Sequence, residues 1–256
     1  MDKEYEKKYH ELEEKNWWFV ARREMLIKQL KALKVPSDAK ILDIGSSGGA
    51  LGLDLRDAGY TNFSLLDYSQ DAVNLCKERG MLNAYCMDGH NPEFPEASFD
   101  LIIASDCLEH LKDDILALSN WYKLLETNGK LIVYVPAFQY LWSDHDVVNH
   151  HFRRYTKNEL VSKLKQTSIH VIESGYWNFM LYFPTFVVRK LSNVFKKGKS
   201  GVTAEHNNDD LIALSAWQNK MLISLLRVEN KLMQYSPFPI GVSTYAIAQK
   251  TEKAKS

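Results

Sequence analysis

Short apolar runs alternate with helix-like segments between Lys40 and about residue 136, and this alternation restricts the possible folds more than any other feature of the chain. A strand buried on both faces of a parallel sheet is short and apolar throughout, and a helical crossover must carry the chain to the next strand. The pattern therefore predicts an α/β fold, a doubly wound and mostly parallel sheet with helices on both faces. The expected strands cover residues 41–44, 63–66, 84–87, 99–104 and 130–135, and the expected helices between them cover 50–58, 69–79 and 111–125.

The rest of the chain adds elements around this core. Apolar residues recur at helical spacing from Phe19 to Leu33, and the polar residues 1–15 are expected to form a frayed, solvated helix. Thr156 and Glu159 form a T-x-x-E capping box, so we expect a helix to begin at Lys157. Two further strands are expected at 169–174 and 242–249; an aromatic segment, a polar linker and a helix at about 211–233 separate them.

The composition argues against several classes of protein. Thirty-two basic residues balance thirty-two acidic ones, whereas nucleic-acid binding favours a basic excess, so no nucleic-acid partner is expected. Three cysteines without a C-x-x-C pair suit a reducing compartment. The charged N-terminus has no apolar signal core, and the most apolar stretch, Tyr176 to Val188, is too short to span a bilayer and contains Pro184. The expected location is therefore the cytoplasm.

The first chemical signal is the turn Ile41–Gly49, ILDIGSSGG, where a strand ends and a helix begins. Glycines there allow unusual backbone angles and close approach of a ligand, although a tight turn without a ligand would look the same. The second signal is Asp67 at the end of the next strand, where a carboxylate can accept hydrogen bonds from both ribose hydroxyls. The G-x-G-x-x-G of dinucleotide enzymes is absent, and Asp43 precedes the turn. An acid at that place suits a cationic cofactor with an amino-acid tail, not a pyrophosphate.

Four elements occur in order between residues 40 and 136, namely LDIGSSGG, LLDYS, CMDGHNPEFPEASFDLIIASDCLEHL and NGKLIVYVP. In these elements the chain resembles the class I S-adenosylmethionine-dependent methyltransferases, in particular their methyltransferase-11/23-like group. The resemblance implies a seven-stranded Rossmann-like sheet and S-adenosyl-L-methionine as cofactor. It also implies a single domain, with an N-terminal helical lid (1–38), a cofactor-binding core (39–175), a helical insertion (176–237) and a last strand with tail (238–256).

The resemblance also implies roles for single residues. Gly45, Ser46 and Gly49 would shape the loop around the methionine moiety, and Asp43 would orient that loop or approach the amine of the cofactor. Asp67 would hold the ribose, with Tyr68 beside it; Asp88 would meet the adenine amino group, with Gly89 beside it. Ser105 would lie beneath the cofactor, and a lid carrying Trp18 and Arg22 would cover it, with the arginine placed to pair with the cofactor carboxylate. Ser47 departs from the family, which has glycine there, and serine fits if its φ is negative.

Histidines that follow the strands are candidates for the chemistry. The segment 142–155 holds three histidines, two aspartates and two arginines, and it is similar to a W-S-x-H-D...H-x-R-R-Y-T pattern of methyltransferases encoded among glycan-assembly enzymes. An alcohol acceptor must lose a proton, and histidine is a favoured base near neutral pH. We expect His145 as the base, with His150, His151 and His110 as further candidates. The alternative is a solvated loop whose polar residues cap helices.

The segment Asp106–His110 supports a second interpretation. It is similar to the E-x-x-E-H metal site of ubiquinone-type O-methyltransferases, with aspartate for the first glutamate, and such a group could hold Mg²⁺ beside a substrate oxygen. The simpler interpretation is that Glu109 and His110 only begin a helix, so no metal is included in the expected site.

The expected function is O-methylation of a sugar or glycolipid intermediate. The alternatives are metal-assisted methylation of a quinone or aromatic hydroxyl, and a non-catalytic cofactor-binding module. The expected partner is a small-molecule or lipid-linked glycan acceptor. Aromatic residues at 176–188, followed by Lys196, Lys197 and Lys199, would suit contact with a membrane surface. The same segment would equally suit a helical cap on the core.

Overall fold

A computed structural model describes residues 10–197 and 214–251. Its strands form one seven-stranded sheet in the order β3-β2-β1-β4-β5-β7-β6. Neighbouring strands are parallel from β3 to β5, and β7 lies antiparallel between β5 and β6. The strands are β1 (Ile41–Ile44), β2 (Phe63–Asp67), β3 (Ala84–Cys86), β4 (Phe99–Ser105), β5 (Leu125–Pro136), β6 (His170–Trp177) and β7 (Ser243–Gln249). The predicted α/β fold with a doubly wound, mostly parallel sheet is confirmed.

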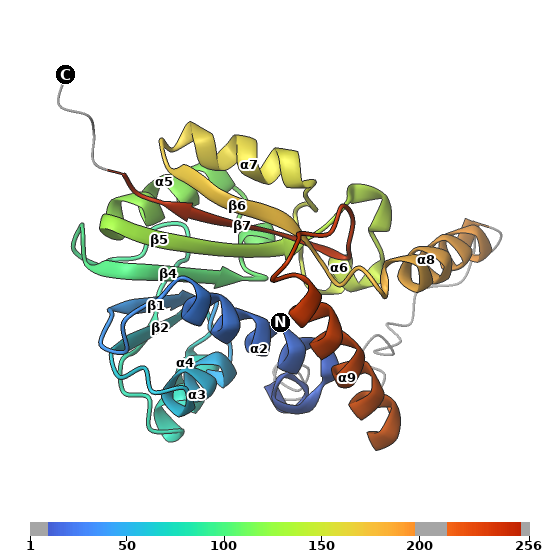
Figure 1. Cartoon of the computed structure of the whole chain (residues 1–256), viewed down its shortest axis with the longest axis horizontal. Helices are drawn as coiled ribbons and strands as arrows, with labels where there is room; N and C mark the ends of the chain where they lie inside the picture. Colours follow the sequence, from blue (N-terminus) through green and yellow to red (C-terminus); the bar gives the residue numbers. More distant parts are fainter. Residues whose placement is uncertain (1–9, 198–213, 252–256) are drawn as a thin grey trace.

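Helices cover both faces of this sheet (Figure 1). They are α2 (Trp17–Ala32), α3 (Ala50–Asp57), α4 (Gln70–Glu78), η1 (Leu108–His110), α5 (Asp114–Leu124), η2 (Gln139–Leu141), α6 (Asp144–Val148), α7 (Lys157–Gln166), α8 (Tyr182–Lys197) and α9 (Ala216–Leu232). Residues 10–15 are also helical. No helix in the described ranges combines the length and the apolar character that crossing a bilayer requires.

Alternate side chains of the central strands enter two separate hydrophobic clusters, as the two-residue period of a strand requires. Leu42, Ile102 and Leu131 belong to the cluster that packs against α5 and α7. Ile41 and Leu101 belong to the cluster on the opposite face, against α2, α3 and α9. The central strands are therefore buried on both faces, which explains why their sequences are apolar throughout rather than alternating.

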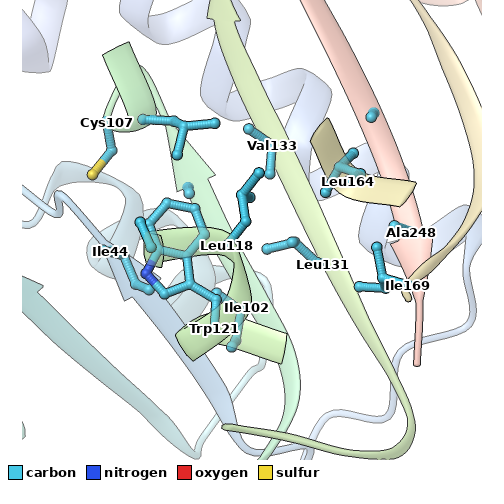
Figure 2. Packing of buried hydrophobic residues seen from close by; sticks show 14 of the residues in the cluster. Ile44, Ile102, Cys107, Leu118, Trp121, Leu131, Val133, Leu164, Ile169 and Ala248 are labelled. Carbon is cyan, nitrogen blue, oxygen red and sulfur yellow. The ribbon is translucent and has the colours of Figure 1, made fainter. Parts of the chain in front are cut away.

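The first cluster reaches the edge of the sheet where the strands end. Figure 2 shows the ring of Trp121, on α5, among Ile44, Ile102 and Leu118. The Trp121 indole nitrogen donates a hydrogen bond to the Gly89 carbonyl at 2.8 Å. The core thus fixes the loop that follows β3, one of the loops expected to carry the cofactor.

The second half of the insertion packs on the N-terminal helix. Asn230 of α9 is fully buried; its amide donates to the Ala21 carbonyl at 2.9 Å and accepts from the Trp177 indole at 2.8 Å. Arg227 forms a two-pronged ion pair with Glu24, at 2.6 and 2.9 Å. Helix α9 is therefore a cap on the core, while α8 extends away from the sheet (Figure 1).

Several boundaries differ from the prediction. The helix expected from residue 111 begins at Asp114, because η1 precedes it and the Asp113 side chain caps its N-terminus. Strand β6 runs beyond residue 174 to Trp177, because its pairing with β7 continues to Ser243. Residues 1–9 and most of the polar linker at 196–210 lie outside the described ranges.

Candidate active site

The loop after β1 brings the first group of candidate residues together. Gly45 and Gly49 have φ of 77° and 79°, and the amides of Gly45 and Ser46 both donate to the Leu66 carbonyl, at 2.8 and 3.0 Å. A Cβ at Gly45 would lie 2.8 Å from the Cβ of Cys107, so glycine is required there for space as well as for conformation. The loop is thereby held against the carboxyl end of β2.

Ser47 differs from the expectation of a negative φ, because its φ is 48°. Two hydrogen bonds accompany this left-handed conformation. The Ser47 amide donates to the Asp67 carboxylate at 2.8 Å, and its hydroxyl hydrogen-bonds with His10 Nδ1 at 2.9 Å. These contacts offset the cost of a side chain at a position where the family has glycine.

Asp67 lies at the end of β2 with its carboxylate held from both sides. One oxygen accepts from the Ser47 amide at 2.8 Å and the other accepts from the Ser69 amide at 2.9 Å. Burial raises the pKa of Asp67, while these two amides act in the opposite direction. Each oxygen keeps a lone pair, so the carboxylate can accept two more hydrogen bonds, as a ribose diol would supply.

Asp43 carries a buried carboxyl with no hydrogen bond to any described residue, and it is 3% exposed. Burial, then the nearby Glu13 and Asp67, raise the pKa of Asp43 to about 8. The Ser46 hydroxyl beside it is also buried and has no partner within the described part of the chain. A buried acid without a partner is unfavourable, so this end of the glycine loop fits a ligand that brings positive charge and hydrogen-bond donors. The sulfonium and ammonium groups of S-adenosylmethionine meet both requirements.

The residues expected near the adenine lie at the rim. Asp88 is exposed and accepts hydrogen bonds from the amide and the ring of His90, both at 2.8 Å. Gly89 is buried beneath it. The Tyr68 side chain is 83% exposed, so it lies on the surface and only its backbone borders the turn after β2.

Arg22 reaches the edge of the sheet but is engaged by the protein itself. Its guanidinium donates to Ser105 at 3.3 Å, to Asp106 at 3.1 Å and to Ser243 at 2.8 Å. The rings of Tyr134 and Trp177 lie 4.2 Å from the guanidinium carbon, and Trp18 lies 5.4 Å away. In this structure the donors of Arg22 are therefore directed at the protein and not toward a cofactor carboxylate, as the resemblance predicts. The arginine links α2 to the ends of the strands.

Three of the four candidate histidines lie together. The rings of His110 and His151 are 4.5 Å apart, and those of His145 and His151 are 6.0 Å apart. The fourth, His150, is exposed at the end of α6 with φ of 56°. The Phe152 amide donates to the Glu109 carbonyl at 2.8 Å, which fixes the histidine loop against η1.

The loop is ordered around Asp146, which is fully buried. Its carboxylate pairs with the Arg154 guanidinium at 2.7 and 3.0 Å and hydrogen-bonds with His151 Nδ1 at 2.9 Å. Burial alone would raise the pKa of Asp146, but the His151 hydrogen bond and the Arg154 charge hold it well below its usual range. A solvated loop does not describe this segment, because its aspartate and both partners are buried or nearly so.

Glu109 and His110 complete the cluster. Glu109 is fully buried, and neither carboxylate oxygen has a hydrogen-bond partner among the described residues. Burial and the charge of Asp106 raise the pKa of Glu109 well above its usual range. Burial and the neighbouring His151 lower the pKa of His110 to about 4. One ligand atom each from Glu109, His110 and His151 lie within 4.8 Å of one another, so this trio could also hold a metal ion.

Some residues of the site carry no recognisable sequence signal. His10 and Glu13 lie in the charged N-terminal run, yet His10 is 8% exposed and contacts the glycine loop. The partnership of Asp146 with Arg154 joins residues eight positions apart, and only the fold of the loop brings them together.

Comparisons with known proteins agree with this geometry. Residues 42–133, from β1 into β5, match the family model described as methyltransferase domain. The phosphoethanolamine N-methyltransferase of Plasmodium falciparum is 29% identical over 140 residues, which cover 51% of this chain and 50% of that protein. The chain spans about half the length of the curated relatives it matches.

Two solved structures share the fold. A chain of the Haloferax volcanii complex between the Trm112 methyltransferase activator and a methyltransferase superposes with a TM-score of 0.64, at 15% identity, over 98% of this chain and 96% of that one. A Haemonchus contortus phosphoethanolamine N-methyltransferase in complex with S-adenosyl-L-methionine gives 0.56, at 17% identity, over 89% of this chain and 52% of that one. Residues 42–133 therefore match the methyltransferase-domain family, and the chain shares the fold of these methyltransferase structures.

Proposed function

We propose that this chain methylates an oxygen of a sugar or glycolipid acceptor. The single observation that carries the proposal is the pairing of His151 with Asp146 beside η1, directly after the strand end expected beneath the cofactor. S-adenosylmethionine, when bound, supplies a methyl group on a positively charged sulfur. The contribution of the protein is to align the acceptor hydroxyl and to take up its proton.

His151 is built to accept that proton. An ionised Asp146 accepts the Nδ1 proton of His151, which fixes the ring and leaves the lone pair of Nε2 as the acceptor. The acceptor oxygen would gain the methyl group as the methyl carbon–sulfur bond breaks and S-adenosylhomocysteine leaves. The proton of the acceptor would pass to Nε2 of His151, and Asp146 would stabilise the resulting imidazolium. Arg154 keeps Asp146 ionised, so it acts through the aspartate as a positioning residue.

This assignment moves the leading role from His145 to His151. The reason is the geometry of His151, whose Nδ1 lies 2.9 Å from the buried Asp146 carboxylate, a partner that orients and strengthens a base; the His145 ring contacts the Asn149 amide at 3.2 Å. We expect His151→Asn to lower turnover by roughly 10²–10⁴-fold while cofactor affinity stays within about twofold. His150→Asn in the same loop is the matched control, and unchanged turnover is expected because that ring is exposed. Equal turnover of His151→Asn and the wild type would refute the assignment.

The acceptor class needs its own experiment. Incubation with methyl-labelled S-adenosylmethionine and separate pools of glycolipids, soluble sugars, phenols and amines would show which pool becomes labelled. Label in a sugar-containing product, with methyl ether linkage by mass spectrometry, is the expected result. Label only in the amine pool would exclude the oxygen acceptor, and no turnover with any pool despite cofactor binding would favour the non-catalytic binding module.

Metal-assisted methylation is the second candidate function, and the trio Glu109, His110 and His151 is the observation that favours it. A divalent cation there would bind the acceptor oxygen and lower its pKa, in place of proton transfer to His151. Prolonged dialysis against a chelator distinguishes the two functions. Full activity after dialysis supports the histidine base, whereas loss of activity that returns with Zn²⁺, Mn²⁺ or Mg²⁺ supports the metal.

A lipid-linked acceptor would be presented at a membrane surface, and α8 is the surface we propose for that contact. Its exposed apolar side chains include Phe183 (58% exposed) and Val188 (66% exposed), and the helix extends away from the sheet (Figure 1). Flotation with anionic vesicles at low salt tests the contact, because electrostatic attraction is strongest there. We expect the wild type to bind the vesicles and Phe183→Ser to bind them more weakly. A wild type that stays unbound would contradict the membrane contact and favour a soluble acceptor.

A further inference from the structure

Hydrogen bonds and ion pairs on both sides hold the helical residues 10–15 against the glycine loop, residues 45–49. The His10 ring hydrogen-bonds with Ser47 and lies so close to Gly48 that a Cβ there would approach the ring at 3.2 Å. Arg23 donates to the Glu13 carbonyl at 2.5 Å and pairs with Asp54 on α3 at 2.7 Å. These contacts place the segment against the same loop that Asp43 and Asp67 border.

Arg79 forms a second link between the segment and the loop. It donates to the Gly48 carbonyl at 2.6 Å and pairs with Glu14, so one guanidinium joins the loop to the segment. Glu14 is thereby neutralised by a cation of the protein. Glu13, the preceding residue, is not neutralised in this way.

The Glu13 side chain is 14% exposed, and its Oε2 is buried without a hydrogen-bond partner among the described residues. His10 Nδ1 lies 3.9 Å from this oxygen and also hydrogen-bonds with Ser47 at 2.9 Å. The charge of Glu13 acts on both Asp43 and Asp67 and raises the pKa of each. These three carboxyl groups thus repel one another near the glycine loop, and the Ser47 and Ser69 amides and the charge of His10 oppose that repulsion at Asp67.

We propose that Glu13 is a third cofactor-binding carboxylate, supplied by the N-terminal segment, and that it binds the ammonium group of S-adenosylmethionine. The proposal rests on the proposed function, because it takes the same cofactor in the same pocket. Its independent support is the Ser46 hydroxyl, which is buried without a partner among the described residues, and the buried Asp43 carboxyl; both lie at the same end of the glycine loop.

The ammonium is the better partner than the ribose or the adenine. Asp67 already offers its free lone pairs to a diol, and Asp88 lies at the rim on the far side of β2. Glu13 lies at the glycine-loop end, because its Oε2 is 3.9 Å from the His10 ring that contacts Ser47 and Gly48. A charge-assisted hydrogen bond from an ammonium would satisfy the buried Oε2, and the bound cofactor would in turn hold residues 10–15 closed.

The test compares three ligands on the full chain by titration calorimetry, with displacement where binding is weak. S-adenosylmethionine and S-adenosylhomocysteine both carry the ammonium group, whereas 5′-methylthioadenosine carries neither an ammonium nor a sulfonium group. Glu13→Gln should weaken the first two by about tenfold or more and change the third by less than about twofold. Glu13→Asp, which keeps the charge, should recover part of the loss. Glu11→Gln, in the same segment but exposed, should change none of them.

Other outcomes would overturn the proposal in distinguishable ways. An equal loss for all three ligands would mean that Glu13 only supports the fold of the pocket. A loss for S-adenosylmethionine alone would assign Glu13 to the sulfonium instead. Wild-type affinity in Glu13→Gln would remove the residue from the site while leaving the proposed function intact. If the wild type binds neither S-adenosylmethionine nor S-adenosylhomocysteine, the proposed function itself fails.

Discussion

Replacing Asp43 with asparagine should change how the stability of the ligand-free protein depends on pH. The Asp43 carboxyl is buried and its pKa is raised from 3.8 to about 8, so the folded protein keeps a proton there that the unfolded chain releases. The stability that this proton contributes is fully present at pH values below the unfolded pKa of 3.8. It is lost as the pH rises toward the folded pKa of about 8. Asparagine has nearly the shape of the protonated acid and does not titrate.

The size of the effect follows from the two pKa values. Between them, the free energy of unfolding falls by about 1.4 kcal/mol for each pH unit. From pH 6 to pH 8 the loss reaches about 2 kcal/mol, because the folded protein itself begins to ionise near pH 8. The stability of Asp43→Asn relative to the wild type should therefore rise by about 2 kcal/mol over this range.

Urea unfolding of both proteins at pH 6 and pH 8, without cofactor, measures this difference. The subtraction removes the contribution of every other titrating group that the two proteins share. Asp38→Asn is the matched control, since that residue is exposed, and its stability relative to the wild type should not change with pH. A difference between Asp43→Asn and the wild type that is the same at both pH values would refute the reasoning.

Three further predictions concern the surroundings of the site. Arg22→Ala should lower the free energy of unfolding by about 2–3 kcal/mol in urea titrations, because it removes the guanidinium that pairs with half-buried Asp106 and donates to buried Ser243, whereas the exposed Arg56→Ala should change it by less than about 0.5 kcal/mol; similar values for the two would contradict the role of Arg22. Gly45→Ala should cost about 2 kcal/mol more than Gly59→Ala, because both have positive φ but only the first would press its Cβ against a neighbour at 2.8 Å; equal melting temperatures of the two variants would argue against this crowding. Stability should fall by about 1.6 kcal/mol between pH 6.5 and 5 through His110, whose lowered folded pKa of about 4 means that the unfolded chain takes up the proton first; the fall should be absent in His110→Asn, and an identical fall in that variant would assign it to other groups.

The sheet was predictable because its strands are buried on both faces. Uninterrupted apolar runs such as 41–44 and 99–104 follow from that burial, and the turn chemistry between them marks the helices. The details that were not predicted depend on tertiary contacts. The extension of β6 to Trp177 is set by pairing with β7, and the docking of α9 on α2 depends on Asn230, which looks like an ordinary polar residue of an amphipathic helix.

The candidate site divides in the same way. Asp43 and Asp67 lie in the last two residues of their strands and the glycine loop follows β1, so the topology of a parallel sheet is enough to bring them together. The choice among the histidines needed the fold, because the fold of the loop brings His151 within hydrogen-bonding distance of Asp146. Glu13 is one of several glutamates in a charged segment, and nothing in its local sequence distinguishes it. The roles of these residues and the single-domain layout remain predictions for experiment.

The most direct test of the account is whether S-adenosylmethionine binds at the strand ends through Asp67. Titration calorimetry of the wild type and of Asp67→Ala measures this without knowledge of the acceptor. We predict that the wild type binds one cofactor per chain and that Asp67→Ala binds it roughly 10- to 100-fold more weakly, since charged hydrogen bonds to the ribose are lost. A wild type that does not bind the cofactor, or an Asp67→Ala variant that binds it equally well, would contradict the account.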